Sequence, residues 1–330
     1  MTPLGEKIAA LIAANGPITI ADYMALCLGD REHGYYMVRE PFGGSGDFIT
    51  APEVSQIFGE LIGLWAVATW QAMGSPSPFV LVELGPGRGT LMADLLRAAR
   101  LRPAFLDAAR IHLVETSPRL RAIQEATLAG AAVTWHAAID ALPAGPAIVV
   151  ANEFFDALPI RQYVATASGW AERMVGLDEA GRLRFGMRDS AGPSSTVPTH
   201  AKPSARMGKP TPSGEGDTPY GAGGIVEISP AATAIMSTLA TRIASDGGAA
   251  LIIDYGYEGP AFGETLQAVR GHRHVDPLAE PGEADLTAHV DFAALARAAA
   301  EAGARPRCHG ADLQGAGRVA FRPCASRLRW

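Results

Sequence analysis

Residues 79–91 read Phe-Val-Leu-Val-Glu-Leu-Gly-Pro-Gly-Arg-Gly-Thr-Leu, and this stretch decides the fold class. Its first half is apolar with β-branched residues, which is typical of a buried parallel strand. Gly85, Gly87 and Gly89 follow, and a helical pattern begins directly after them. Glycines let the backbone turn sharply and approach a ligand closely, at the edge of the sheet where ligands bind. The stretch therefore predicts a cofactor loop, with a purely structural turn as the alternative.

A second strand, at 111–115, ends in a carboxylate. Glu115 closes the run Ile-His-Leu-Val-Glu and is followed by Thr116. Two carboxylate oxygens can accept hydrogen bonds from both hydroxyls of a ribose, which suits any adenosine cofactor. We therefore assign Glu115 and Thr116 to cofactor binding. Asp140, after the third strand, is predicted to meet an adenine amino group, with a plain turn residue as the alternative.

The spacing of the glycines and the position of Glu83 favour one cofactor. The Gly-x-Gly-x-Gly form lacks the spacing of the dinucleotide fingerprint, Gly-x-Gly-x-x-Gly. Glu83 directly precedes the loop, where it would repel a pyrophosphate and tolerate a cation. S-adenosylmethionine carries a sulfonium and no phosphate. The pattern thus favours S-adenosylmethionine over NAD.

Composition excludes several classes of protein. The 330 residues carry a net charge of −6 and an isoelectric point near 5.8, which argues against a nucleic-acid partner. Cys27, Cys308 and Cys324 are too scattered for a disulfide framework or a metal site. No signal peptide, presequence or membrane-length apolar run is recognisable. We expect a cytoplasmic protein without membrane contact; nothing in the sequence indicates an oligomeric state.

The order of strand-like and helix-like segments predicts an α/β fold with a doubly wound, Rossmann-like sheet. We expect a helical N-terminal extension or lid at 1–75, a cofactor-binding core at 76–165 and 225–330, and an insertion at 166–224. The insertion begins as a β-meander, and its polar part, 189–224, is predicted to be disordered.

Two further expectations concern single elements. A long helix opening near Pro52 and running to about Met73 is apolar on most faces, so we expect it to be buried against the sheet. After the insertion, the main sheet is expected to resume at 225–228.

The fourth strand is followed by Asn152-Glu153-Phe154-Phe155-Asp156. Two acids on one strand-to-loop transition are costly to bury without purpose. Glu153 and Asp156 are predicted to clamp a guanidinium, assisted by Asn152, while Phe154 or Phe155 walls the acceptor pocket. The alternative is an ordinary exit loop in which Asp156 caps a helix.

Asp47, Thr50 and Glu53 form a polar cluster that we expect to fold over the cofactor and substrate as a lid. The alternative is that Thr50 or Glu53 simply starts the long helix. The histidines and aspartates between 272 and 291 do not match metal-ligand spacings, so they are given structural roles and no metal site is predicted.

Several ordered strings resemble the MidA-like family of class I S-adenosylmethionine-dependent methyltransferases, whose members include a mitochondrial complex I assembly factor. The resemblance covers nearly the whole chain. Its strings lie at 16–24, 34–36, 46–53, 55–60, 83–91, 152–159, 227–230 and 285–292.

The resemblance implies S-adenosylmethionine at the glycine loop and Glu115. It also implies symmetric ω-N-dimethylation of a protein arginine whose guanidinium Glu153 holds, on a respiratory complex I subunit or a similar protein. Two alternatives stay open: a methyltransferase for another small-molecule or protein substrate, and a non-catalytic assembly factor that binds the cofactor.

The C-terminal tail departs from the family pattern. Family members end in a Gln-Gly-x-Phe-Leu-like strand and a helix, whereas residues 316–330 here are rich in arginine and contain no acid. This departure indicates a shifted reading frame in the gene record, and we expect the last strand and helix to be damaged.

Overall fold

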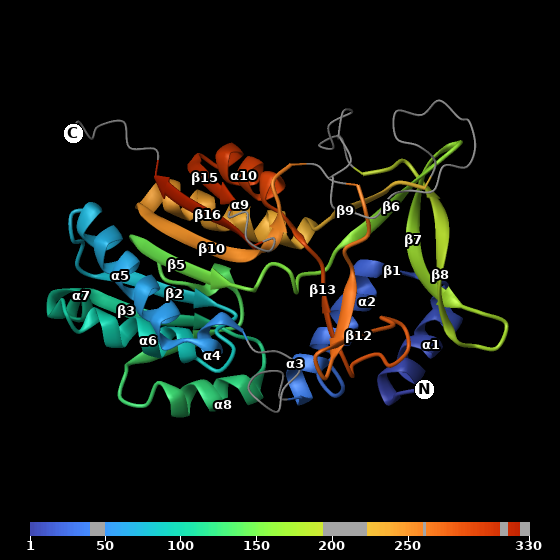
Figure 1. Cartoon of the computed structure of the whole chain (residues 1–330), viewed down its shortest axis with the longest axis horizontal. Coiled ribbons are helices and arrows are strands. Elements are labelled where there is room, and N and C mark those ends of the chain that lie inside the picture. The colour runs from blue at the N-terminus through green and yellow to red at the C-terminus, as the bar shows by residue number, and fades with distance from the viewer. Residues whose placement is uncertain (40–49, 194–222, 260–261, 311–315, 324–330) are drawn as a thin grey trace.

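The computed structural model describes residues 1–39, 50–193, 223–259, 262–310 and 316–323. A large open sheet with helices on both faces forms one half of the molecule (Figure 1). The N-terminal helices and two smaller sheets form the other half (Figure 1). The contact between these two halves decides which residues can share a binding site.

The large sheet has eight strands, of which five adjacent ones are parallel. Strand order reverses between β2 and β5, which creates the switch point where ligands bind in open α/β sheets. The predicted doubly wound α/β fold is therefore confirmed. In spatial order the strands are β15 (Ala304–Gly310), β16 (Ala316–Pro323), β10 (Gly248–Tyr257), β5 (Ala147–Asn152), β2 (Phe79–Leu84), β3 (Ala109–Val114) and β4 (Val133–His136), with β14 (Val290–Asp291) pairing the end of β10.

Helices cover both faces of this sheet because its central strands are apolar on both sides. In β2, Val80, Val82 and Leu84 pack under α9 and α10, while Phe79 and Leu81 pack against α5, α6 and α7. Figure 1 shows the resulting three layers. The helices are α5 (Gln56–Ala72), α6 (Thr90–Ala99), α7 (Pro103–Ala108), α8 (Pro118–Thr127), α9 (Pro230–Asp246) and α10 (Phe292–Glu301), with a short 3-10 turn at Ile139–Ala141.

The long helix expected from Pro52 to Met73 is wrong in two respects. It is broken at Ser55, whose backbone is extended, so that α4 (Ala51–Val54) precedes α5. It is also not buried all round: Ile62 and Trp70 are buried, but Leu61 is 60% exposed. The reason is that α5 lies in the outer layer and has a neighbour, α6, on one side.

The other half contains the meander in an antiparallel sheet. The β-meander was predicted correctly. The expectation that the main sheet resumes at 225–228 is wrong, because these residues form β9, which pairs with β6 and not with the parallel sheet. Strand β8 also extends through Asp189 and Ser190, into the segment expected to be disordered; residues 194–222 of that segment lie outside the described ranges. The sheet comprises β1 (Ile18–Thr19), β7 (Gly169–Leu177), β6 (Arg161–Thr166), β9 (Ile225–Ile228) and β8 (Leu183–Ser190).

The N-terminal helices share a core with a third, three-stranded sheet. Leu4, Ile8 and Tyr23 are buried together with Leu266 and Leu286. The first part of the N-terminal extension, residues 3–38, is therefore packed into the second half by apolar contacts, whereas α5 belongs to the large sheet. The elements involved are α1 (Pro3–Asn15), α2 (Ile20–Gly29), α3 (Tyr35–Val38), β12 (Arg273–Val275), β11 (Gln267–Arg270) and β13 (Asp285–Thr287).

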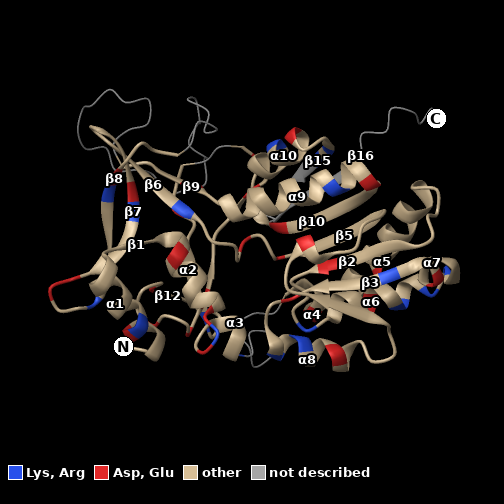
Figure 2. Cartoon of the chain, turned by 180° about the vertical axis from the view of Figure 1, so that it is seen from behind, with Lys and Arg blue, Asp and Glu red and all other residues tan. Residues whose placement is uncertain are grey.

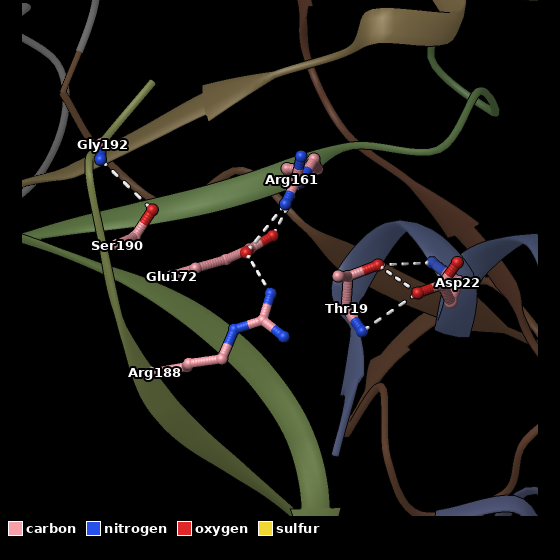
Figure 3. A network of polar contacts seen from close by, with 7 residues as sticks. All are labelled: Thr19, Asp22, Arg161, Glu172, Arg188, Ser190 and Gly192. Atoms are coloured by element: carbon pink, nitrogen blue, oxygen red, sulfur yellow. Dashed lines mark hydrogen bonds and ion pairs between the residues drawn. The ribbon is translucent and has the colours of Figure 1, made fainter. Parts of the chain in front are cut away.

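Two polar arrangements fix the edge of the meander (Figure 3). Thr19 and Asp22 form a capping box at the start of α2. The buried carboxylate of Glu172 accepts two hydrogen bonds from Arg161, at 2.6 and 2.8 Å, and one from Arg188 at 2.9 Å. Burial raises the pKa of Glu172, but these guanidinium groups outweigh it and hold the pKa below its usual value.

The expectation of a damaged last strand is also wrong. Residues 316–323 form β16, which lies antiparallel between β10 and β15 and completes the sheet. The sequence expected for the final helix falls at 324–330, outside the described residues. Within the described ranges, no helix is both long and apolar enough to cross a bilayer.

Candidate active site

A cavity of about 740 Å³ lies between the two halves, at the carboxyl ends of β2 and β5. The parallel sheet contributes the glycine loop, Glu115 and Glu153 to its lining, and the other half contributes Tyr36 and Asp285. Figure 2 shows acidic residues at the ends of the central strands that face this junction. The site is thus assembled from both halves.

The glycine loop forms the floor of the cavity. Gly85, Gly87 and Gly89 have φ values of 58°, 53° and 82°, in the left-handed region that side chains disfavour. A Cβ atom at Gly85 would lie 2.7 Å from the ring of Phe154, which also lines the cavity. Glycine is therefore required in this loop for two reasons: the φ values are positive, and the Phe154 ring occupies the space that a side chain at Gly85 would need.

Glu115 is held in place by two neighbours. One carboxylate oxygen accepts a hydrogen bond from the Ser117 N–H at 2.7 Å, and the other accepts one from Gln124 Nε2 at 3.1 Å. Gln124 also donates to the carbonyl of Gly87 at 2.8 Å and so links the carboxylate to the glycine loop. Each oxygen keeps a lone pair that a ribose hydroxyl can use. Sequence reasoning missed Gln124, whose only signal was a polar residue on the inner face of α8.

Glu83 is a buried carboxyl in the lining of the cavity, directly before the glycine loop. Its side chain is 3% exposed, and its Oε2 atom has no hydrogen-bond partner among the described residues. Burial raises the pKa of this carboxyl to about 8. A buried carboxyl whose Oε2 atom has no partner among the described residues, beside the glycine loop and Glu115, suits an adenosine cofactor with a cationic amino-acid tail. The residues present therefore fit S-adenosylmethionine.

A second group of acidic side chains, here called the acidic end, is contributed to the cavity lining by the loop after β5 and by β13. Glu153, Asp156 and Asp285 all line it, and Tyr36 donates its hydroxyl hydrogen to the Asp285 carboxylate, with both oxygens 2.9 Å away. Burial raises the pKa of Asp156 well above its usual range, and the nearby carboxylates of Asp254 and Asp285 raise it further. Repulsion among buried carboxylates is relieved when a cation enters. This end therefore suits a positively charged acceptor.

Two of these acidic-end residues were missed by the sequence analysis. Tyr36 stood in an unassigned string, and Asp285 was given a structural role, as were His274 and His289, which also line the cavity. Both residues lie far from Glu153 along the chain, so no local spacing links them to it. The fold brings Tyr36 of α3 and Asp285 of β13 to the same cavity as Glu153, and the two side chains are hydrogen-bonded to each other there.

The remaining predicted residues divide into three groups. Thr50, Glu53 and Thr116 line the cavity, and Glu53 accepts a hydrogen bond from Thr90 Oγ1 at 2.6 Å. Asn152 also lines it, whereas Asp140 is exposed and is not part of the lining. Asp47 lies outside the described residues. The binding roles of all of them stay predictions, and for Asp140 the cavity offers no support.

Among the described residues, no group of three or more His, Cys, Asp or Glu side chains is arranged to hold a metal ion.

The sheet order, with one antiparallel strand next to the edge, and the glycine cradle at the switch point define a class I methyltransferase. Residues 61–309 match the model of a family described as S-adenosyl-L-methionine-dependent methyltransferases, and the chain belongs to this family. It is an S-adenosylmethionine-dependent methyltransferase.

Its relatives support the same conclusion. Protein arginine methyltransferase NDUFAF7, mitochondrial, from Danio rerio is 39% identical over 90% of this chain and 72% of its own length. The Homo sapiens protein of the same name is 37% identical over 91% of this chain and 69% of its own. A COG1565 superfamily structure from Burkholderia thailandensis, bound to S-adenosyl-homocysteine, has a TM-score of 0.78 at 27% identity and covers 97% of this chain and 91% of its own.

These relatives correct one expectation. We expected a cytoplasmic protein because no targeting segment was recognisable, but these relatives, at 37–39% identity, are named mitochondrial. The absence of a recognisable targeting segment was therefore a poor guide to location.

Proposed function

We propose that this methyltransferase acts on an arginine side chain of a protein, forming symmetric ω-N-dimethylarginine on a respiratory complex I subunit or a similar protein. The observation that carries the proposal is the acidic end of the cavity, where Glu153, Asp156 and Asp285 line one space. The relatives, which are named protein arginine methyltransferases, agree with it.

The chemistry requires little beyond orientation and charge. When bound, S-adenosylmethionine supplies a methyl group on a sulfonium that leaves as a neutral thioether. Glu153 and Asp156 would accept hydrogen bonds from the guanidinium and hold one terminal nitrogen towards that methyl group. The carboxylates concentrate positive charge on the other nitrogens, so that the lone pair of the attacking nitrogen becomes available. The product remains a cation, and one proton is released to a carboxylate or to water.

The two halves have separate tasks in this proposal. Glu83 and Glu115 of the parallel sheet would bind the cofactor's cationic and ribose groups. Tyr36 and Asp285, from the other half, would close the acceptor end and exclude water, which strengthens the electrostatic contacts inside.

The test is a labelling experiment. The purified chain is incubated with methyl-labelled S-adenosylmethionine and a protein extract, and labelled proteins are hydrolysed and analysed for methylated amino acids. We expect symmetric dimethylarginine. Glu153→Gln should reduce labelling by at least about 100-fold, because it removes the charge that orients the guanidinium, with cofactor affinity changed less than about threefold.

Glu179→Gln is the matched control, because Glu179 is an exposed glutamate in the β7–β8 turn. It should label as the unmodified chain does. Label on another side chain or on a small molecule would refute the arginine proposal. Cofactor binding without any transfer would favour the non-catalytic assembly factor instead.

A further inference from the structure

The loop after β5 has an unusual backbone at the residue that matters most. Glu153 has a φ of 48°, and it is one of three non-glycine residues with positive φ among the described residues. Such a conformation is strained for a residue with a side chain, and it persists only where surrounding contacts enforce it. Something must therefore hold the loop.

Asp254, near the end of β10, provides the contacts. Its Oδ2 atom accepts hydrogen bonds from three successive peptide N–H groups, those of Phe154 at 3.1 Å, Phe155 at 2.9 Å and Asp156 at 3.3 Å. Its Oδ1 atom accepts one from the Tyr255 N–H at 2.8 Å. The carboxylate is 1% exposed and so exchanges no bonds with solvent.

The neighbouring backbone contact completes the arrangement. The Glu153 N–H donates to the carbonyl of Ile253 at 2.8 Å, as a continuation of the β5–β10 ladder. Every peptide N–H from 153 to 156 thus has its acceptor on β10. Strand β10 thus pairs with β5 and, through Asp254, also binds the loop that follows β5.

Asp254 is not itself part of the cavity lining, whereas Glu153, Phe154 and Asp156 are. The carboxylate therefore reaches no acceptor or cofactor. Burial raises the pKa of Asp254 to about 7, and the N–H groups that it accepts from oppose this rise. Burying a carboxylate costs free energy, and the hydrogen bonds to the loop offset that cost here. Holding the loop is therefore the structural role of the Asp254 carboxylate.

We propose that Asp254 is the positioning residue of this methyltransferase: by holding three consecutive N–H groups it keeps Glu153 in its left-handed conformation and aims the Glu153 carboxylate and the Phe154 ring into the cavity. The role of Glu153 towards a guanidinium rests on the proposed function above. The grip of Asp254 on the loop does not.

Asp254→Asn tests the proposal with little change of shape. An amide carries no charge and has only one acceptor oxygen, so in either orientation the loop N–H groups lose their charged acceptor, and either they or the Tyr255 N–H lose a partner altogether. We expect kcat to fall about 10- to 100-fold, as for a displacement of about 1 Å in a reacting group. The affinity for S-adenosylmethionine, measured by calorimetry, should change less than threefold.

A double-mutant cycle separates positioning from general destabilisation. If Asp254 acts through Glu153, the variant carrying Asp254→Asn and Glu153→Gln should be no slower than Glu153→Gln alone, within about threefold. If the fold-decreases in kcat of the two single variants multiply in the double variant, the proposal is overturned. An unchanged kcat in Asp254→Asn would also overturn it.

Amide hydrogen exchange gives a readout that needs no turnover. In the cofactor-free protein, Asp254→Asn should accelerate exchange at the amides of 154–156 at least about 10-fold, since these amides lose their charged acceptor. Unchanged exchange there would also overturn the proposal.

Asp246→Asn is the matched control. Asp246 likewise accepts a backbone N–H, that of Gly145 at 3.0 Å, but at the opposite end of β5. It should leave kcat and the exchange of 154–156 unchanged. The outcomes also separate the two proposals: methyl transfer to a side chain other than arginine would refute the proposed function, while the cycle and the exchange data would still decide the role of Asp254.

Discussion

At the scale of single residues, the site depends on carboxylates whose environments differ sharply. Glu83 is buried with one oxygen atom unpartnered, Glu115 is braced by Ser117 and Gln124, and Glu153 is held in a strained conformation. The same functional group therefore has three different environments in one cavity, and burial and hydrogen bonding set the properties of each carboxyl separately.

Glu83 allows a prediction about cofactor binding. Because burial raises its pKa to about 8, the carboxyl is mostly neutral in the free protein at pH 6.5 and must ionise to attract the cofactor's positive charge. The affinity for S-adenosylmethionine should rise as pH increases from 6.5 to 8.5, with proton release. Glu83→Gln should weaken binding about 10-fold at pH 8.5 and abolish this dependence. Calorimetry in two buffers of different ionisation enthalpy measures both effects; pH-independent binding and no proton release in the unmodified chain would contradict it.

At the scale of elements, α5 shows how position in the layers decides the importance of an apolar residue. Ile62 and Leu61 are neighbours in sequence and similar in hydrophobicity, yet the first is 5% and the second 60% exposed. Sequence pattern alone treats them alike.

The two residues form a matched pair for a stability measurement. Ile62→Ala should lower the free energy of unfolding by about 2–5 kcal/mol, because it leaves a cavity between α5 and the sheet. Leu61→Ala should change it by no more than about 0.5 kcal/mol, since little burial is lost. Urea unfolding monitored by circular dichroism measures both. Equal losses would mean that Leu61 is covered in solution.

At the scale of the whole molecule, the junction concentrates acids that the unfolded chain would ionise near pH 4. Burial raises the pKa of Glu83 to about 8 and that of Asp254 to about 7, and the pKa of Asp156 is raised well above its usual value. The folded cofactor-free protein consequently binds more protons than the unfolded chain up to about pH 8.

This difference sets the sign of a pH effect on stability. Because the unfolded state binds fewer protons, the free energy of unfolding must fall as pH rises from 7 to 8.5. His112 and His136 do not change the sign of this pH effect. Burial lowers their pKa in the folded protein, and above pH 7 both side chains are largely neutral in the folded and in the unfolded chain. Thermal unfolding should show a decrease of at least about 2 °C, which Glu83→Gln reduces. A melting temperature that is constant or rises over this range would contradict the prediction.

The sequence by itself determined the class of fold and identified the cofactor, and Glu83, Gly85, Gly87 and Glu115, which it assigned to that cofactor, all line one cavity. The glycine loop, Glu83 and Glu115 each lie within or next to a strand, so their chemistry and spacing are readable along a short stretch of chain. The loop at 152–156 was readable for the same reason.

Only the tertiary structure decided the acceptor end. Tyr36, Asp254 and Asp285 meet Glu153 from three distant segments, and the pairing of β9 with β6 depends on partners far away in the sequence. Strand pairing and burial are set by non-local contacts that no local period encodes. The glycine loop could therefore be recognised from its own residues, whereas the grip of Asp254 on the loop after β5 became visible only once β10 lay beside it.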